Sequence, residues 1–187
     1  MKILRGKLIP TALVLCCCSI ATSGQLKSDP FAAVPQAERK DLATRLSDYV
    51  RYYKARNWAE LYSLVSDVGK DRLDSPTFES IMKREHGGRA YSAMPNLEAF
   101  EPAQSRQEGD GIDIYGCAKA KREGQQFKGV AVVHAVREHD TWAFSGWSFT
   151  EFPNQSCGVL SDPGWKAPAE MEWGLPMEEF RGVHKDH

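Results

Sequence analysis

The chain has 187 residues, of which 42% are hydrophobic and 26% are charged. This length suits one domain with appendages, and the composition favours a packed core over disorder. The formal net charge is −1, so the chain lacks the basic excess that nucleic-acid binding requires. We therefore expect no nucleic-acid partner.

The beginning of the chain has the pattern of a secretory signal peptide. Lys2, Arg5 and Lys7 precede a short apolar run over residues 8–20, and small residues follow at 21–23, where a signal peptidase would cut. Loss of these three positive charges changes the net charge from −1 to −4. We predict that residues 1–23 are removed and that the mature chain is exported, to the periplasm or out of the cell.

A lipid anchor is the alternative at this end of the chain. Cys16, Cys17 and Cys18 lie within the predicted signal. A lipoprotein signal has a small residue directly before the acylated cysteine, whereas here Leu15 or another cysteine stands there. A cleaved signal without lipid is therefore favoured, and we expect membrane contact only if the anchor forms.

Three helices are predicted after a linker over residues 24–36. The first follows from apolar residues at helical spacing, namely Leu42, Leu46, Tyr49, Val50 and Tyr53. Asn57 is predicted to cap the second helix, with Glu60 completing a capping box. Ser75 is predicted to cap the third, with Pro76 at its first helical position, and residues 86–88 end it.

The centre of the chain predicts an antiparallel meander. Its strands are expected over residues 112–120, 127–136 and 142–152, because these stretches are rich in β-branched and aromatic residues. Tight turns are expected at Glu123-Gly124 and at His139-Asp140. A further strand is predicted over residues 97–100, and residues 105–111 have the composition of a polar loop.

Symmetric turns would place a polar row across the three strands of the meander. Asp113 would then lie opposite His134, and His134 opposite Ser145. The face that they share, which we expect the helices to cover, would carry Tyr115, Cys117, Val130, Val132, Val136, Ala143, Trp147 and Phe149 as well. A one-residue bulge in either hairpin would move side chains to the opposite face.

The mature chain keeps two cysteines, Cys117 and Cys157. In an oxidising compartment this even number favours one disulfide over two separate thiols. Residues 154–187 form a C-terminal tail with prolines and two tryptophans, Trp165 and Trp173. A bridge would tie this tail to the first strand of the meander.

Helices followed by a curved antiparallel sheet define the α+β class. The sequence texture of Tyr52-Tyr53, of residues 57–64 and of residues 75–78 resembles the opening of the nuclear-transport-factor-2-like (cystatin-like) superfamily. This resemblance covers residues 38–152 and implies a bent sheet wrapped around a long helix, with a conical pocket between them, in a domain over residues 37–153. Two features depart from the family: the strands follow all the helices, and the tail has no counterpart.

The superfamily contains isomerases, dehydratases, binding modules and protein-interaction domains, so fold alone does not select a function. We predict a non-catalytic domain that binds a small apolar molecule or a protein partner. The predicted pocket is lined by Tyr49, Tyr53, Tyr115, Val132, His134, Ser145 and Trp147. A homodimer formed through the sheet is a further expectation.

The alternative is an isomerase- or hydrolase-type enzyme that uses Asp113 or His134 as a general base. An Asp–His–Ser row is also the pattern of nucleophilic catalysis, but Ser145 lies in mid-strand without the sharp turn that exposes a nucleophile. His184 and His187 lie in a charged terminal segment, which is typical of a solvated end. We expect no metal and no cofactor.

Overall fold

The computed structural model describes residues 29–87, 96–122, 124–151, 157–162, 165 and 172–173. The predicted signal peptide and most of the predicted tail lie outside the described residues. No helix in the described ranges is long and apolar enough to cross a membrane.

The helices come first in the chain, and all but the first of them start at a side-chain cap. They are α1 (Arg39–Ala55), α2 (Trp58–Ser63), α3 (Asp67–Arg72) and α4 (Ser75–Gly87). The predicted cap of α2 is confirmed, since the Asn57 side chain accepts a hydrogen bond from the Glu60 N–H. The prediction for α4 was one residue late, because the Asp74 carboxylate accepts from the Thr77 N–H at 2.8 Å. The short helix α3 was not predicted.

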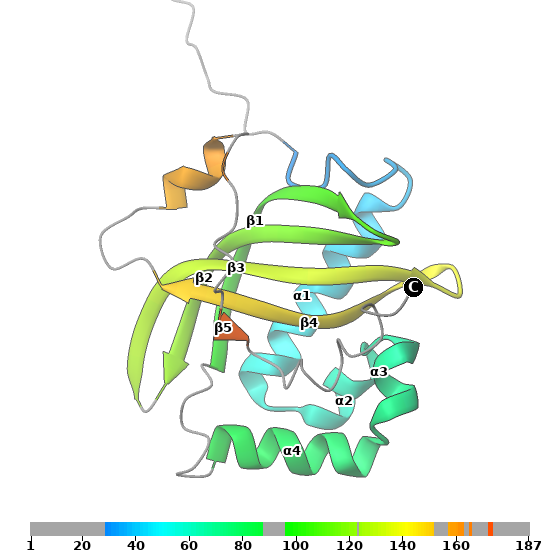
Figure 1. The fold of residues 1–187 in the computed structure, drawn as a ribbon, viewed down its shortest axis with the longest axis vertical. Helices are drawn as coiled ribbons and strands as arrows, with labels where there is room; N and C mark the ends of the chain where they lie inside the picture. Colours follow the sequence, from blue (N-terminus) through cyan, green and yellow to red (C-terminus); the bar gives the residue numbers. More distant parts are fainter. Residues whose placement is uncertain are drawn as a thin grey trace, which may run out of the picture.

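The strands form one antiparallel sheet in the order β1-β2-β3-β4-β5 (Figure 1). They are β1 (Asn96–Glu108), β2 (Gly111–Arg122), β3 (Gln125–Glu138), β4 (Thr141–Glu151) and the two-residue β5 (Glu172–Trp173), with a short 3₁₀ helix, η2 (Cys157–Ser161), between β4 and β5. The predicted polar loop over residues 105–111 is wrong at its start, because β1 continues to Glu108. The backbone of this polar stretch pairs with β2, and composition alone does not indicate that a partner strand is present.

The turn at His139-Asp140 lies where it was predicted, and Gly124 lies between β2 and β3 as predicted, whereas Glu123 is outside the described residues. His139 and Asp140 have positive φ angles of 47° and 61°, as a two-residue hairpin turn of type I′ requires, and Gly124 has a φ of 84°. The β2–β3 register is also confirmed, with Asp113 opposite His134 and Tyr115 opposite Val132.

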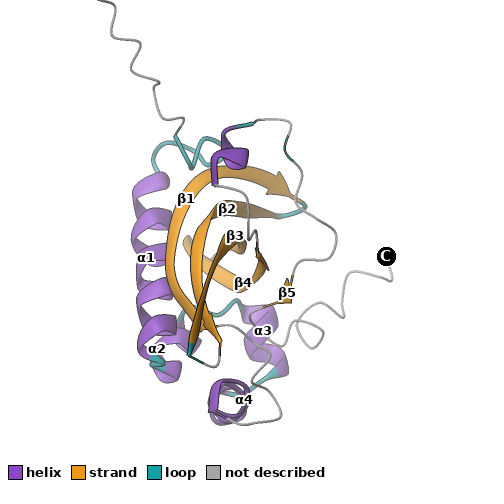
Figure 2. Cartoon of the chain, turned by 90° about the vertical axis from the view of Figure 1, so that its left-hand side faces the viewer, coloured by secondary structure: helices purple, strands orange, loops and turns teal. Residues whose placement is uncertain are grey.

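The sheet is curved, and α1 lies along one of its faces (Figure 2). Helix and sheet together make an α+β domain. We call the covered face the helix face; it carries Ile112, Ile114, Ala131, Val133, Phe144 and Trp147, which pack with α1 in the main hydrophobic core. An amphipathic helix and a sheet commonly bury their apolar surfaces by packing the apolar stripe of the helix against one face of the sheet.

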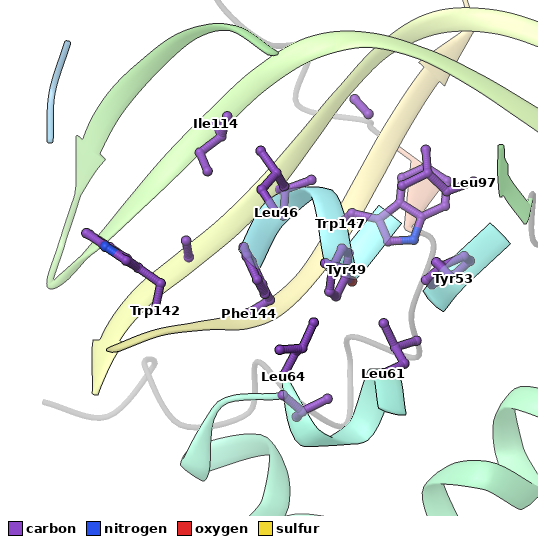
Figure 3. Close-up of a cluster of buried hydrophobic side chains, with 14 of the residues drawn as sticks. Leu46, Tyr49, Tyr53, Leu61, Leu64, Leu97, Ile114, Trp142, Phe144 and Trp147 are labelled. Carbon is purple, nitrogen blue, oxygen red and sulfur yellow. The ribbon is translucent and has the colours of Figure 1, made fainter. Parts of the chain in front are cut away.

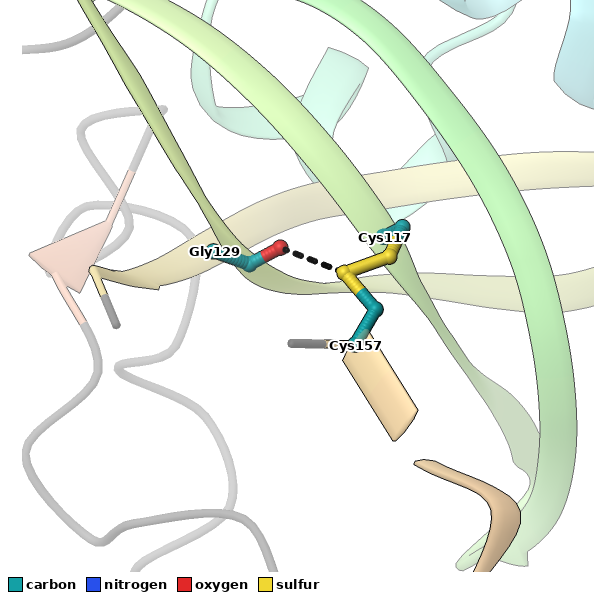
Figure 4. Close-up of a disulfide and its surroundings, with 3 residues drawn as sticks. All are labelled: Cys117, Gly129 and Cys157. Carbon is teal, nitrogen blue, oxygen red and sulfur yellow. Dashed lines mark hydrogen bonds between the residues drawn. A yellow bond between two sulfur atoms is a disulfide. The ribbon is translucent and has the colours of Figure 1, made fainter. Parts of the chain in front are cut away.

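The opposite face, the disulfide face, has a smaller cluster of its own. Tyr115, Val130 and Val132 pack there against Leu160 of η2. The predicted disulfide is present between Cys117 on β2 and Cys157 on η2, with a Cα–Cα distance of 5.7 Å (Figure 4). The bridge therefore fixes the beginning of the C-terminal region to the face that α1 leaves uncovered.

Candidate functional site

A groove runs between α1 and β1, where the long helix passes the edge of the sheet. It has a volume of about 790 Å³, and eight of its twelve lining residues are apolar. The lining consists of Phe31, Ala43, Leu46, Ser47, Val50, Arg51, Lys54, Ala55, Glu98, Ala99, Phe100 and Pro102. An apolar hollow with a few polar groups is the usual form of a ligand site.

Two neighbouring stripes of residues on α1 explain how the helix contacts both the main core and the groove. Leu42, Tyr49 and Tyr53 are buried in the core. Ala43 and Val50 lie one position further round the helix; they pack against the main core but are only partly buried, because they also border the groove. Residues one step apart on a helix point in directions about 100° apart, so one amphipathic helix can present both stripes.

The charged groups at the groove are mostly paired with neighbours. Arg51 contacts the Asp48 carboxylate at 2.7 Å and lies over the Tyr52 ring. Glu98 accepts a hydrogen bond from the Asn96 side chain at 2.8 Å. Arg51 and Glu98 therefore add charged groups to a lining that is otherwise mainly apolar.

A second arrangement, on the disulfide face, contains the acid–base pair predicted from the sequence. His134 Nδ1 lies 2.7 Å from Asp113 Oδ1, and the Tyr115 hydroxyl donates to Asp113 Oδ2 at 3.3 Å. The two partners are 27% and 20% exposed, so solvent reaches both. A carboxylate on one ring nitrogen orients an imidazole and leaves the other nitrogen available for chemistry.

Glycine allows the His134 ring to lie close to the neighbouring strand. A Cβ on Gly111 would lie 2.7 Å from both Nε2 and Cε1 of His134. Gly146 stands directly opposite His134 on β4, with a φ of 135° that favours glycine. Neither position has a side chain beside the imidazole, whose remaining cross-strand neighbour is Asp113.

Aromatic and cationic groups cover Tyr115. Its ring makes an edge contact with Trp165 at a centroid distance of 5.8 Å, and the Arg106 guanidinium lies 5.2 Å from its centroid. Arg106 also donates to the Trp165 carbonyl oxygen. Burial, followed by the negative charge of Asp113, raises the pKa of the Tyr115 phenol to about 12. Tyr115 therefore acts as a hydrogen-bond donor to Asp113 at neutral pH.

The predicted β3–β4 register is wrong beyond Ser145. Near the turn it holds, with Ala135 opposite Phe144, but the next pair is His134 with Gly146. Ser145 is the extra residue of a bulge, and its hydroxyl donates to Ser66. The slip of one residue moves Trp147 and Phe149 to the helix face, away from His134. The prediction that the helices cover the His134 face is wrong for the same reason.

The seven side chains predicted to line one pocket are consequently divided between the two faces. Tyr49, Tyr53 and Trp147 meet in the main core, where all three are fully buried (Figure 3). The Tyr53 ring makes edge contacts with Trp147 at 5.6 Å and with Trp58 at 5.7 Å. Burial raises the pKa of Tyr49 well above its usual value. These aromatics stabilise the core.

Tyr115, Val132 and His134 lie on the disulfide face, and Ser145 lies at the bulge. None of the seven predicted residues lines the groove between α1 and β1. Sequence reasoning missed the groove because its walls come from two elements, α1 and β1, that are separated by the 40 residues 56–95. The available signal was the second apolar stripe of the first helix, at Ala43 and Val50.

Metal-ligating side chains do not gather in the part of the chain that the structure describes, where no group of three or more His, Cys, Asp or Glu residues could hold an ion.

Comparisons with known proteins do not assign a family. No family model matches the chain, and no curated protein matches it. A solved structure, that of Bdellovibrio bacteriovorus Bd1075, is similar at a TM-score of 0.45 and 14% identity, over 64% of this chain and 45% of that one. The chain thus spans less than half the length of that protein, and a likeness at this level carries no argument about function.

Proposed function

We propose that this chain is an exported, non-catalytic binding domain of the nuclear-transport-factor-2-like type. Its ligand is a small apolar molecule or an apolar segment of a protein partner, and it binds in the groove between α1 and β1. The observation that carries this proposal is the groove itself: its walls are mainly apolar, and Asp113 and His134 are not among its lining residues. Apolar walls suffice for a binding domain, whereas an enzyme needs its acid–base groups inside the cavity.

A neutral apolar fluorophore, N-phenyl-1-naphthylamine, tests this proposal directly. Ser47 is exposed and lines the groove, so Ser47→Trp should fill part of it. Thr44, one turn earlier on α1, is exposed but is not a lining residue, which makes Thr44→Trp the matched control. We expect Ser47→Trp to weaken fluorophore binding by about tenfold, or about 1.4 kcal/mol, and Thr44→Trp to leave it unchanged.

Emission from the fluorophore, excited in its own absorption band, measures both affinities without interference from the added indoles. Circular dichroism verifies that both variants are folded. Absence of binding to the unmodified chain, or equal binding by the two variants, would refute the groove as the binding site.

A second candidate function rests on the hydrogen bonds of Asp113. The carboxylate is held by His134 on one oxygen and by Tyr115 on the other, an arrangement that would suit a general base of an isomerase- or hydrolase-type enzyme. Turnover of an activated aryl ester or of a β,γ-unsaturated ketone would support this function if His134→Gln abolished it. Equal rates for the unmodified chain and for His134→Gln would exclude it for those substrates.

A further inference from the structure

The groove is bordered by an edge of the sheet. β1 is the first strand in the sheet order and, among the strands that the structure describes, pairs only with β2. In the described part of the chain, Ala99 and Phe100 make no backbone hydrogen bond to any segment other than β2. An edge strand has backbone N–H and C=O groups that point away from its neighbour and can pair with another chain.

The residues of β1 that line the groove show that it reaches this edge. Glu98 is the extra residue of the bulge between Leu97 and Ala99, but beyond this bulge Ala99 and Phe100 are consecutive, and both are lining residues. Successive side chains of a strand point to opposite faces, so a hollow over one face would be lined by alternate residues only. A run of consecutive lining residues places the backbone edge itself beside the groove.

We infer that the groove binds an extended apolar peptide, which adds a strand to the edge of β1. This inference rests on the proposed function and specifies its ligand. The peptide backbone would pair with β1, and alternate apolar side chains would contact Leu46, Val50 and Phe100. Strand addition between an edge strand and a helix is an established mode of peptide recognition, in which backbone hydrogen bonds provide affinity and side-chain contacts provide specificity.

The edge itself limits which segments can pair. Register shifts occur between Leu97 and Ala99 and between Pro102 and Gln104, and Pro102 has no N–H to donate. The regular stretch is therefore short. Bulges, proline and charged side chains such as Glu98 are features that prevent two identical edges from pairing. Because they leave only the short stretch between the two register shifts for pairing, they fit a short peptide better than the long edge of a second copy of this chain.

Charge gives the peptide a second constraint. Arg51 is paired with the Asp48 carboxylate, whereas Glu98 accepts a hydrogen bond from the neutral Asn96 amide and keeps its negative charge at the rim of the groove. Because an apolar wall gains from burying apolar surface, the peptide's inward side chains are expected to be aliphatic or aromatic and uncharged.

Selection from a library of random octapeptides displayed on phage tests the inference. The purified chain is the bait, and Ser47→Trp is used for counter-selection against peptides that bind elsewhere. Enriched peptides with apolar residues at alternate positions are expected. If the fluorophore binds and no peptide is enriched, the inference is overturned while the proposed function stands; if neither binds, both fail.

Backbone N-methylation then separates strand addition from binding by side chains alone. An enriched peptide is made in two forms, each with three alternate backbone amides methylated. In one form the methylated amides lie along one edge of the extended peptide, and in the other form they lie along the opposite edge. One form should bind about thirtyfold more weakly, which is about 2 kcal/mol in total or about 0.7 kcal/mol for each of three hydrogen bonds, and the other should bind within about threefold of the parent. Equal affinities of the two forms, whether reduced or unchanged, would overturn pairing with β1.

Discussion

Removal of the Cys117–Cys157 disulfide should be the most destabilising single change on the disulfide face. The bridge closes a segment with a sequence separation of 40 residues. In the chain-entropy model, a closed loop of this length removes about 13 cal/mol/K from the unfolded ensemble, or about 4 kcal/mol at 25 °C. Typical domains are stable by about 5–15 kcal/mol, so this is a large share.

The folded state itself should change little in the double variant Cys117→Ser/Cys157→Ser. Leu160 stays in its cluster with Val130 and Val132, and the Trp165 ring stays against Tyr115, because neither contact involves the sulfur atoms. The loss of unfolding free energy should therefore come from the unfolded state, which becomes less compact without the bridge.

Urea unfolding of the oxidised chain and of the double variant measures this difference. With a slope of about 2 kcal/mol/M, a loss of about 4 kcal/mol lowers the midpoint by about 2 M, and the slope itself should rise because more surface is exposed on unfolding. The oxidised chain after reduction serves as a second comparison. A difference in unfolding free energy below about 1 kcal/mol, with unchanged slope, would refute the loop-entropy reasoning.

The remaining predictions concern export, a helix cap, a glycine and a tyrosine. The mature N-terminus should lie near Gly24, and N-terminal sequencing of exported protein checks it; the mass of a diacylglycerol on a cysteine would favour the lipoprotein alternative. Asn57→Ala should cost about 1 kcal/mol in urea unfolding through loss of the α2 cap. Gly111→Ala should cost about 1–3 kcal/mol, because its Cβ would meet the backbone of Ala135 and the imidazole ring; an unchanged unfolding midpoint would contradict this close contact. The pKa of Tyr115 is raised from 10.0 to about 12. The contribution of its phenol to the free energy of unfolding is therefore complete below pH 10 and is lost as pH rises toward 12. Unfolding midpoints of the unmodified chain and of Tyr115→Phe should accordingly converge over that range, and a constant difference would contradict the shift.

Local signals in the sequence determined much of this fold. Asn57 caps α2 because its side chain reaches the Glu60 N–H, a contact that depends on residues three apart. The turn at His139-Asp140 and the pairing of Asp113 with His134 follow from turn position and strand alternation. The joining of Cys117 and Cys157 was predicted from the even number of cysteines that remain after the predicted signal peptide and from the compartment that this signal predicts. Each of these depends on neighbours in the chain or on a choice with few alternatives.

Tertiary structure alone decided which face of the sheet Trp147 occupies. Both faces of the meander have apolar residues, so alternation could not indicate where the register shifts. The bulge at Ser145 places Trp147 against Tyr53 in the main core and leaves His134 on the opposite face. The glycine at position 146 is the local sign of a bulge, but it does not show which residue is displaced, and the bulge changes the surroundings of every side chain beyond it.

The groove was likewise decided only by packing. It requires the side stripe of α1, at Ala43 and Val50, to lie beside the edge of β1 at Ala99 and Phe100. Neither stretch indicates the other, because the distance between them in space is set by how α1 packs on the helix face. Sequence patterns identify apolar stripes, but only the tertiary fold determines which stripe is buried in the core and which borders a site.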